Sequence, residues 1–194
     1  MRCGIYGGSF NPIHNGHLEL SRSLLRQGLV DEVWLMVSPL NPFKQGSREL
    51  LPDQVRLRLA SLAVEGEPRI KVSDFETHLP QPSYMAVTLQ RLRESFPQHE
   101  FTLVIGADNW PRFPDWHKAE EILALHHIII CPRPGFEVCA RELPPNVSLA
   151  PTPLLPISSS GIRQRIRQAS YRGEGLPRSV WQDIQANHYY QCHE

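Results

Sequence analysis

The chain has 194 residues, 41% hydrophobic and 21% charged, an ordinary composition for a globular protein long enough to bury a sizeable core. Its 20 lysines and arginines balance its 20 aspartates and glutamates, so the formal net charge is zero, which excludes a broad basic surface for nucleic acid. The longest apolar runs, at residues 33–37 and 128–131, are far shorter than the roughly 20 residues that span a bilayer.

The N-terminal residues MRCGIYGGSF lack the apolar core and cleavage site of a secretory signal. The cysteines, at Cys3, Cys131, Cys139 and Cys192, form neither a CxxC pair nor a zinc-binding spacing. We therefore expect a cytoplasmic protein without disulfides, structural metal, nucleic-acid partner or membrane partner. Cys3 and Cys131 lie in apolar segments, and we expect them to be small buried side chains.

Strand and helix patterns alternate along the chain. The first half predicts a strand at 2–6 ending in two glycines, a helix from about 16 ended by Gly28, a strand at 33–37, a polar loop at 40–51, a helix from Pro52 to Gly66, and a strand at 69–72. The second half predicts a loop at 77–82, a helix with Ser83 as N-cap, a strand at 101–105, a short helix at 118–125 and a strand at 127–131. An extended proline-rich connection at 144–156, with a short strand at 147–149, is predicted to follow. The last two predicted elements are a helix at 161–168 and a helix from Pro177 with Trp181, Ile184 and His188 on one stripe.

This alternation of short apolar strands with helices predicts an α/β fold, a Rossmann-like doubly wound parallel sheet with helices on both faces. We expect one domain over residues 1–194, with C-terminal helices from about residue 160. Ligands of such sheets bind beyond the carboxyl ends of the strands. Polar segments follow Tyr6, Val37 and Ile105, the last residues of three predicted strands, so we expect a ligand site there.

The segment GGSFNPIHNGH at residues 7–17 joins the first strand to the first helix. Its two leading glycines let the backbone approach a ligand and adopt positive φ. Ser9 and the free N–H groups at the helix start, where Gly16 and His17 lie, favour a phosphate. His14 and His17 lie near one helical face and suit a phosphate that gains charge in a transition state. The alternatives are a metal-binding pair or incidental histidines, and the spacing matches neither GxGxxG nor a Walker loop.

Two further segments begin predicted turns or helices. In ISSSGIR, residues 157–163, serines open a helix and Arg163 in its first turn can bind two phosphate oxygens; a plain serine cap with a solvated arginine is the alternative. In GADNW, residues 106–110, Gly106 permits close approach of a ribose or base and Asp108 can accept from sugar hydroxyls. The alternative there is a turn with Asp108 as N-cap.

The last two candidates concern a flat ring and a carboxylate. Trp116 can stack on a heterocycle or belong to the core. The segment PSY at residues 82–84 begins a helix whose free N–H groups can hold a carboxylate, and an ordinary helix cap is the alternative.

Together these segments resemble a known enzyme family. GGSFNPIHNGHL resembles the HxGH signature of the nucleotidyltransferases, and ISSSGIR resembles their ISSTxxR signature. PSY, GADNW with Trp116, and RPG at residues 133–135 resemble the bacterial nicotinate-nucleotide adenylyltransferases, over a span from Gly4 to about His188. The resemblance implies transfer of the AMP part of ATP, with Mg²⁺, to nicotinate mononucleotide, yielding nicotinate adenine dinucleotide and pyrophosphate. It implies direct in-line attack by a phosphate oxygen without a covalent intermediate, in a monomer or small homo-oligomer.

The resemblance also assigns site residues. The implied ATP-binding residues are Gly8, Ser9, Phe10, His14, Gly16, His17, Gly106, Asp108, Ser159, Ser160 and Arg163, with His14, His17 and Arg163 in catalysis. The implied nicotinate-nucleotide residues are Gly8, Ser9, Lys44, Ser83, Tyr84, Met85 and Trp116. Trp116 would stack on the pyridine ring, and backbone N–H groups near Tyr84 and Met85 would receive the carboxylate.

The sequence departs from the family pattern at three positions. Asn11 stands where the family more often has Asp, Ser160 replaces Thr, and Met85 replaces Thr and leaves only a backbone contact.

Three alternative functions remain open at this point. A sister enzyme, such as pantetheine-phosphate adenylyltransferase or a nicotinamide-preferring form, is the nearest; the former has Thr in place of His14 and lacks GADNW and PSY. A non-catalytic nucleotide sensor would be expected to have lost His17 or Arg163, both of which are present. An HxxH metal hydrolase would need a third ligand that no motif supplies.

Overall fold

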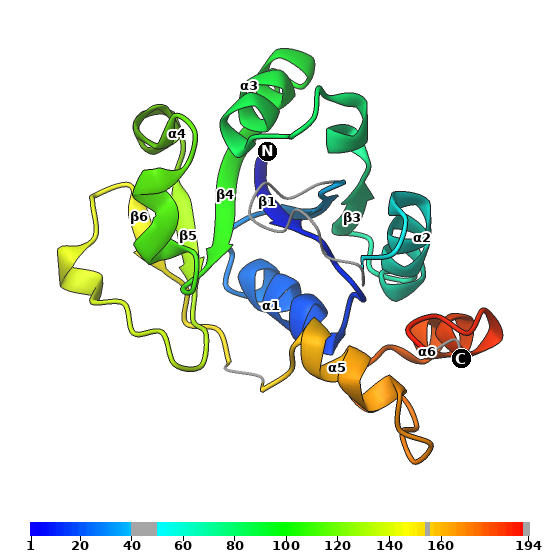
Figure 1. The fold of residues 1–194 in the computed structure, drawn as a ribbon. Helices are drawn as coiled ribbons and strands as arrows, with labels where there is room; N and C mark the ends of the chain where they lie inside the picture. The colour runs from blue at the N-terminus through cyan, green and yellow to red at the C-terminus, as the bar shows by residue number, and fades with distance from the viewer. Residues whose placement is uncertain (40–49, 154–155, 192–194) are drawn as a thin grey trace.

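In the computed structural model, which describes residues 1–39, 50–153 and 156–191, six parallel strands form one sheet in the order β3-β2-β1-β4-β5-β6 (Figure 1). The strands are β1 Arg2–Gly8, β2 Glu32–Val37, β3 Ile70–Ser73, β4 Glu100–Gly106, β5 Ile128–Cys131 and β6 Val147–Leu149. The helices are α1 Asn15–Arg26, α2 Asp53–Ala63, α3 Met85–Ser95, α4 Ala119–Leu125, α5 Ser159–Ile166 and α6 Arg178–Ala186, with short 3-10 helices η2 Phe75–His78, η3 Trp110–Asp115 and η4 Ala140–Glu142.

Side chains that alternate along each strand build one apolar core on each face of the sheet. In β1, Tyr6 packs with the core that includes α1, α2, α5 and α6, whereas Cys3 and Ile5 pack with the core that includes α3 and α4. The prediction of a doubly wound parallel sheet is therefore confirmed. Cys3 and Cys131 are both fully buried, also as predicted.

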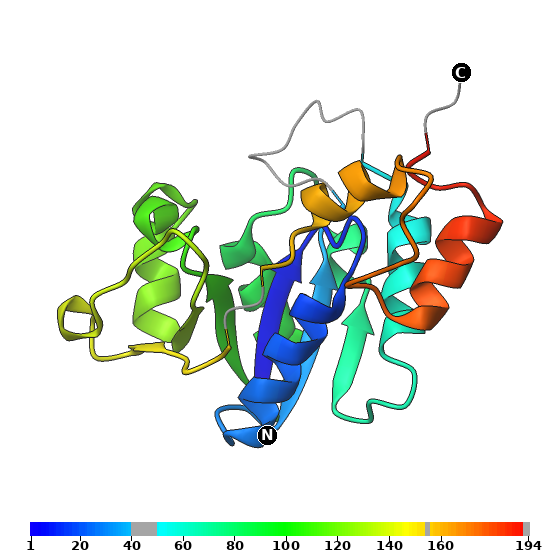
Figure 2. The same cartoon turned by 90° about the horizontal axis from the view of Figure 1, so that it is seen from below.

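The strand order places a topological switch point between β1 and β4. The chain starts in the middle of the sheet, runs outward to β3, and returns to pair β4 with the other side of β1, with Tyr6 beside Val104. Connections on the two sides leave the sheet in opposite directions, and this opens a crevice at the carboxyl ends of these strands. Figure 2 shows α5 lying across these ends. Among the described residues, no helix is long and apolar enough to cross a bilayer.

The predicted end of α1 is confirmed by its cap, whereas α2 ends at Ala63, before the predicted Gly66. Gly28 has φ 64° after α1, and the N–H of Leu29 donates to the carbonyl of Leu24 at 3.1 Å, the left-handed helix ending that the sequence predicts. The short strand at residues 147–149 is present as β6.

Three local predictions are wrong. Ser83 is not the N-cap of α3, because the helix begins at Met85 and Tyr84 occupies the cap position. The predicted loop at residues 77–82 begins inside η2, since a buried Glu76 holds this segment against α3. His188 does not extend the apolar stripe of α6: the helix ends at Ala186, and His188 is exposed with φ 54°.

Candidate active site

A cavity of about 1500 Å³ opens at the carboxyl ends of β1 and β4, where the switch point lies. Predicted site residues from five separate segments line it: Gly8, Ser9, Phe10, His14, His17, Ser83, Tyr84, Met85, Gly106, Asp108, Trp116, Ser159, Ser160 and Arg163. Gly16 is not part of this lining; a Cβ there would lie 3.0 Å from the His14 ring, so its small size makes room for that ring. Lys44 lies outside the described residues.

The two histidines stack at the start of α1. Their ring centroids are 3.7 Å apart, and His14 is the N-cap residue. The backbone N–H of His14 donates to Nδ1 of His17 at 3.2 Å, so a neutral His17 carries its proton on Nε2 and can donate it to a ligand oxygen. His14 is 1% exposed, and burial, aided by the charge of Arg133, lowers its pKa to about 3. His14 is therefore neutral at pH 7.

The glycines at the end of β1 act through their size and not through positive φ, which corrects the sequence prediction. Both are extended within the strand, because the ladder to β2 continues through Gly8. A Cβ at Gly7 would lie 3.0 Å from the Met85 side chain, and one at Gly8 would lie 3.1 Å from the Phe10 ring. The left-handed residue is Phe10, at φ 43°, whose buried ring packs edge-on against His17.

At the end of β4, Gly106 makes room for a charged pair. A Cβ there would lie 2.3 Å from Asp108 Oδ1 and 2.9 Å from Arg133 Nε. Arg133 Nε lies 3.7 Å from Asp108 Oδ1, and its Nη2 donates to the hydroxyl of Tyr6 at 3.1 Å. Arg133 therefore brings a positive charge into the cavity wall. The sequence reasoning used it only as part of the RPG segment, although its place just after the apolar strand at 128–131 could have marked it.

The amino end of α5 is bound to the loop that precedes His14. Ser158 caps the helix, its Oγ accepting from the N–H of Gly161 at 3.1 Å. Because α5 starts at Ser159, Arg163 lies in its second turn, whereas the sequence predicted the first. Arg163 Nη1 donates to the carbonyl of Asn11 at 2.9 Å, and Ser159 Oγ donates to the carbonyl of Pro12 at 2.9 Å.

Arg56 of α2 supports the floor of the cavity and was missed by sequence reasoning. Its side chain is fully buried. The guanidinium donates to backbone carbonyls of the loops that follow β1 and β2, at 2.7 Å to Ser9 and 2.8 Å to Ser38, and to that of Leu51 at 2.8 Å. It also pairs with Asp53 at 2.6 Å. A lone arginine in a helix pattern carries no local signal of this role.

The other end of the cavity is aromatic and lies at the start of α3. The ring of Tyr84 is 4.6 Å from that of His117, and half-buried Trp116 packs on Phe113 at 5.4 Å. Trp116 thus packs against the core, as one sequence interpretation has it, and also lines the cavity; its stacking on a heterocycle stays a prediction. The first N–H groups of α3, from Met85 onward, have no partner within the helix and are available to an anion.

Within the described residues, no group of three or more histidines, cysteines, aspartates or glutamates is arranged to hold a metal ion. The arrangement thus offers phosphate donors at one end, a charged pair in the middle and an aromatic wall with a helix N-terminus at the other. It can hold two anionic molecules side by side and neutralise charge between them.

Comparisons with known proteins agree with this arrangement. A family model described as cytidylyltransferase-like matches residues 5–165. The probable nicotinate-nucleotide adenylyltransferase of Bacteroides fragilis is 51% identical over 165 residues, covering 85% of this chain and 82% of its own length. That of Bacteroides thetaiotaomicron is 48% identical over 184 residues, covering 95% and 91%. The fold matches the solved structure of Plasmodium falciparum nicotinic acid mononucleotide adenylyltransferase complexed with NaAD, with a TM-score of 0.81, 20% identity and 97% of each chain covered.

Proposed function

Because this chain belongs to the cytidylyltransferase-like family and, within it, to the nicotinate-nucleotide adenylyltransferases, we propose that it transfers the adenylyl group of ATP to nicotinate mononucleotide. The products are nicotinate adenine dinucleotide and pyrophosphate, in NAD biosynthesis. One observation carries the proposal beyond family membership. A single cavity joins the phosphate-binding loop before α1 to Trp116 and the start of α3, so both nucleotides fit in one continuous space.

The reaction needs positioning and charge neutralisation more than acid–base chemistry. A phosphate oxygen of nicotinate mononucleotide, already ionised at neutral pH, attacks the α-phosphorus of ATP, and the bond from that phosphorus to the bridging oxygen of pyrophosphate breaks. We propose that His17 Nε2–H and Arg163 donate to the ATP phosphates, with the amino ends of α1 and α5 adding favourable dipoles. Neutral His14 would orient the His17 ring through their stacking.

We propose that Mg²⁺ enters with ATP. This ion typically keeps several waters and binds through substrate phosphates with few protein carboxylates, which fits described residues that offer no multi-carboxylate cluster. When bound, it would neutralise charge on the phosphate oxygens.

Three further features belong to the proposal. The described segments that line the cavity come from residues 6 to 163 of one chain, and α5 completes the wall, which supports one nucleotidyltransferase domain over residues 1–194.

We propose a monomer or small homo-oligomer, because one chain supplies these segments. We also propose a cytoplasmic enzyme, because ATP and the NAD pathway are there. Zero net charge supports small-molecule partners and not nucleic acid.

Pyrophosphate release from MgATP tests the function, with nicotinate mononucleotide, nicotinamide mononucleotide and phosphopantetheine supplied in turn. An amide faces the free N–H groups of Tyr84 and Met85 with its own donors, so we expect kcat/KM to favour the nicotinate nucleotide by on the order of 10- to 1000-fold. Trp116→Ala should reduce kcat/KM for both pyridine nucleotides by the same factor. Equal use of the two pyridine nucleotides by the wild type would contradict the carboxylate site, and preference for phosphopantetheine would contradict the function.

The assignment of His17 has its own test. His17→Ala should lower kcat by about 100- to 1000-fold, because it removes one preorganised donor, while the melting temperature stays close to that of the wild type. A variant with normal melting and near-normal kcat would remove His17 from the mechanism.

A further inference from the structure

The segment that follows α6 contacts the loop before His14, at a residue that lines the cavity. The hydroxyl of Tyr190 donates to Oδ1 of Asn11 at 2.8 Å, joining two residues 179 positions apart. Figure 2 shows this red segment running from the end of α6 back toward α5. We infer that Tyr190 is a positioning residue for the phosphate-binding loop, an inference that rests on the proposed function.

Asn11 is the point where three parts of the chain meet. It is 4% exposed and lines the cavity. Its Oδ1 accepts from Tyr190 and also from the N–H of Leu51 at 3.2 Å, just before α2. Its backbone carbonyl accepts from Arg163, a proposed phosphate ligand. A shift of the Asn11 side chain would therefore be transmitted to Arg163 and, three residues along the loop, to His14.

The surroundings of Tyr190 keep its hydroxyl a donor. The side chain is largely buried, and burial raises its pKa above the ordinary tyrosine value, with the charges of Arg163 and Arg56 opposing that rise. The hydroxyl thus stays protonated across physiological pH and remains able to bond the Asn11 oxygen. Without that bond, a buried amide oxygen would lose a donor.

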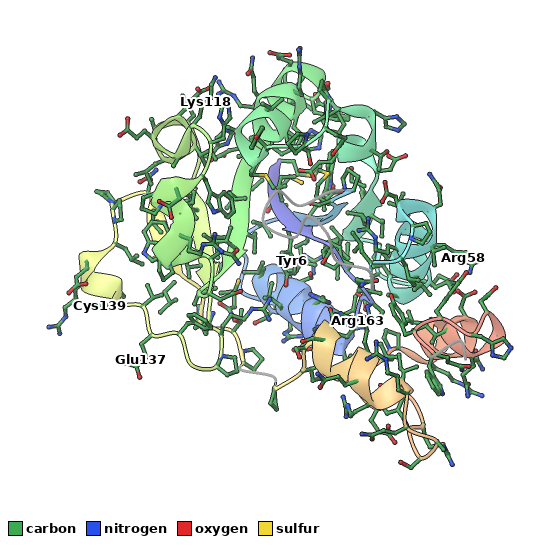
Figure 3. The ribbon with its side chains drawn as sticks, in the orientation of Figure 1. Tyr6, Arg58, Lys118, Glu137, Cys139 and Arg163 are labelled. Carbon is green, nitrogen blue, oxygen red and sulfur yellow. The ribbon has the colours of Figure 1, made fainter. Side chains whose placement is uncertain are left out.

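The preceding residue, Tyr189, provides a matched control. Its hydroxyl accepts from Arg58 Nη2 at 2.8 Å, and Arg58 also pairs with Asp183 of α6 at 2.8 Å. In Figure 3, Arg58 lies at the outer edge of the molecule beside α6, whereas Arg163 lies near its middle. The hydrogen bond of the Tyr189 hydroxyl therefore anchors the same segment to α2 and not to the loop before His14.

The experiment compares Tyr190→Phe with Tyr189→Phe, since each keeps the ring and removes only a hydroxyl. Tyr190→Phe should raise KM for ATP by about 5- to 10-fold, the effect of one hydrogen bond, and leave KM for nicotinate mononucleotide unchanged, because Asn11 lies at the phosphate end. Tyr189→Phe should leave both constants unchanged. Melting curves should show both variants folded at the assay temperature, because each loses a single hydrogen bond.

Coupling between the two partners gives a second readout that does not depend on stability. The double variant Asn11→Ala with Tyr190→Phe should have the same KM for ATP as Asn11→Ala alone, because the bond between the two side chains is already lost. Identical values of KM for ATP in Tyr190→Phe and Tyr189→Phe would overturn the inference. Fully additive increases in this KM in the double variant would overturn it as well.

Calorimetric titration of each variant with MgATP separates this inference from the proposed function. If the wild type released no pyrophosphate with nicotinate mononucleotide, the proposed function would fail. A weaker Kd for MgATP in Tyr190→Phe but not in Tyr189→Phe would still support the positioning role, and equal Kd values would refute it.

Discussion

Burial fixes the charge of individual side chains around the cavity. Burial, aided by the charge of Arg133, lowers the pKa of His14 to about 3. The buried hydroxyl of Tyr6 has its pKa raised to about 12 and stays protonated. Arg133 and Arg163 therefore bring positive charge to the cavity wall, while His14 is neutral beside His17.

The lowered pKa of His14 makes stability depend on pH. The unfolded chain binds this proton near pH 6.5, but the folded chain binds it only near pH 3. Stability from this group is thus complete above pH 6.5 and falls by about 1.4 kcal/mol per pH unit as the pH drops toward 3. Urea unfolding at pH 7 and pH 5 should show that the wild type loses about 2 kcal/mol more than His14→Gln. Equal losses would mean that His14 titrates normally.

Arg163 should contribute mainly to the binding of ATP. Arg163→Ala removes a cation beside the loop before His14, so KM for ATP should rise roughly 10- to 100-fold, the typical effect of a charged hydrogen bond. Arg165→Ala is the control, because its guanidinium lies 5.2 Å from the Tyr171 ring and its Nη2 donates to the Glu174 carbonyl. A rise confined to the KM for nicotinate mononucleotide would assign Arg163 to the wrong substrate.

Among the elements, α2 has a structural role that its surface does not reveal. It carries Arg56 inward and Arg58 outward, because two residues along a helix turn through about 200°. The inward arginine fixes the loops after β1 and β2, which carry Ser9 and Ser38 in the cavity wall. An element away from the chemistry thus determines where the phosphate-binding loop lies.

The two arginines of α2 should differ sharply in their effect on stability. Arg56→Leu leaves several buried carbonyls without donors, so the free energy of unfolding should fall by about 3 kcal/mol or more. Arg58→Leu removes an exposed pair and should cost about 1 kcal/mol or less. Urea denaturation of both variants measures the difference. A loss for Arg56→Leu no larger than that for Arg58→Leu would show that other contacts hold these loops.

For the whole molecule, the cavity is assembled from distant parts of one chain. The switch point between β1 and β4 opens it, α3 and Trp116 close one end, and α5 closes the other. The cavity exists only in the folded chain, so binding of the proposed substrates and folding should be linked.

This linkage predicts stabilisation by nucleotide. MgATP at one hundred times its Kd should raise the free energy of unfolding by about 2.7 kcal/mol. For a chain of this length, each kcal/mol moves the melting temperature by about 2 to 4 °C. Adenosine at the same concentration lacks the phosphates that the histidine loop and α5 would hold, so its shift should be smaller. An equal shift with adenosine would contradict a site in which phosphate contacts dominate.

The sequence by itself determined the features that depend on short-range patterns. The spacing of apolar residues predicted the strands and helices, and their alternation predicted a parallel doubly wound sheet. Polar segments at the ends of strands predicted the position of the cavity, because the carboxyl ends of parallel strands share one edge. His14 and His17 were found in this way, since glycine beside a helix start leaves a local signature, and both line the cavity.

Only the tertiary structure decided which distant residues support that site and how they are charged. Arg56 reaches Ser9 across 47 positions, and Tyr190 reaches Asn11 across 179, contacts that no local pattern encodes. Ser83 was misassigned as a helix cap because its hydroxyl is engaged with Glu76, a contact set by packing. Likewise the neutrality of His14 follows from burial. The physical reason is common to all: propensity and periodicity act between neighbours, whereas burial and long-range hydrogen bonds exist only once the elements have packed.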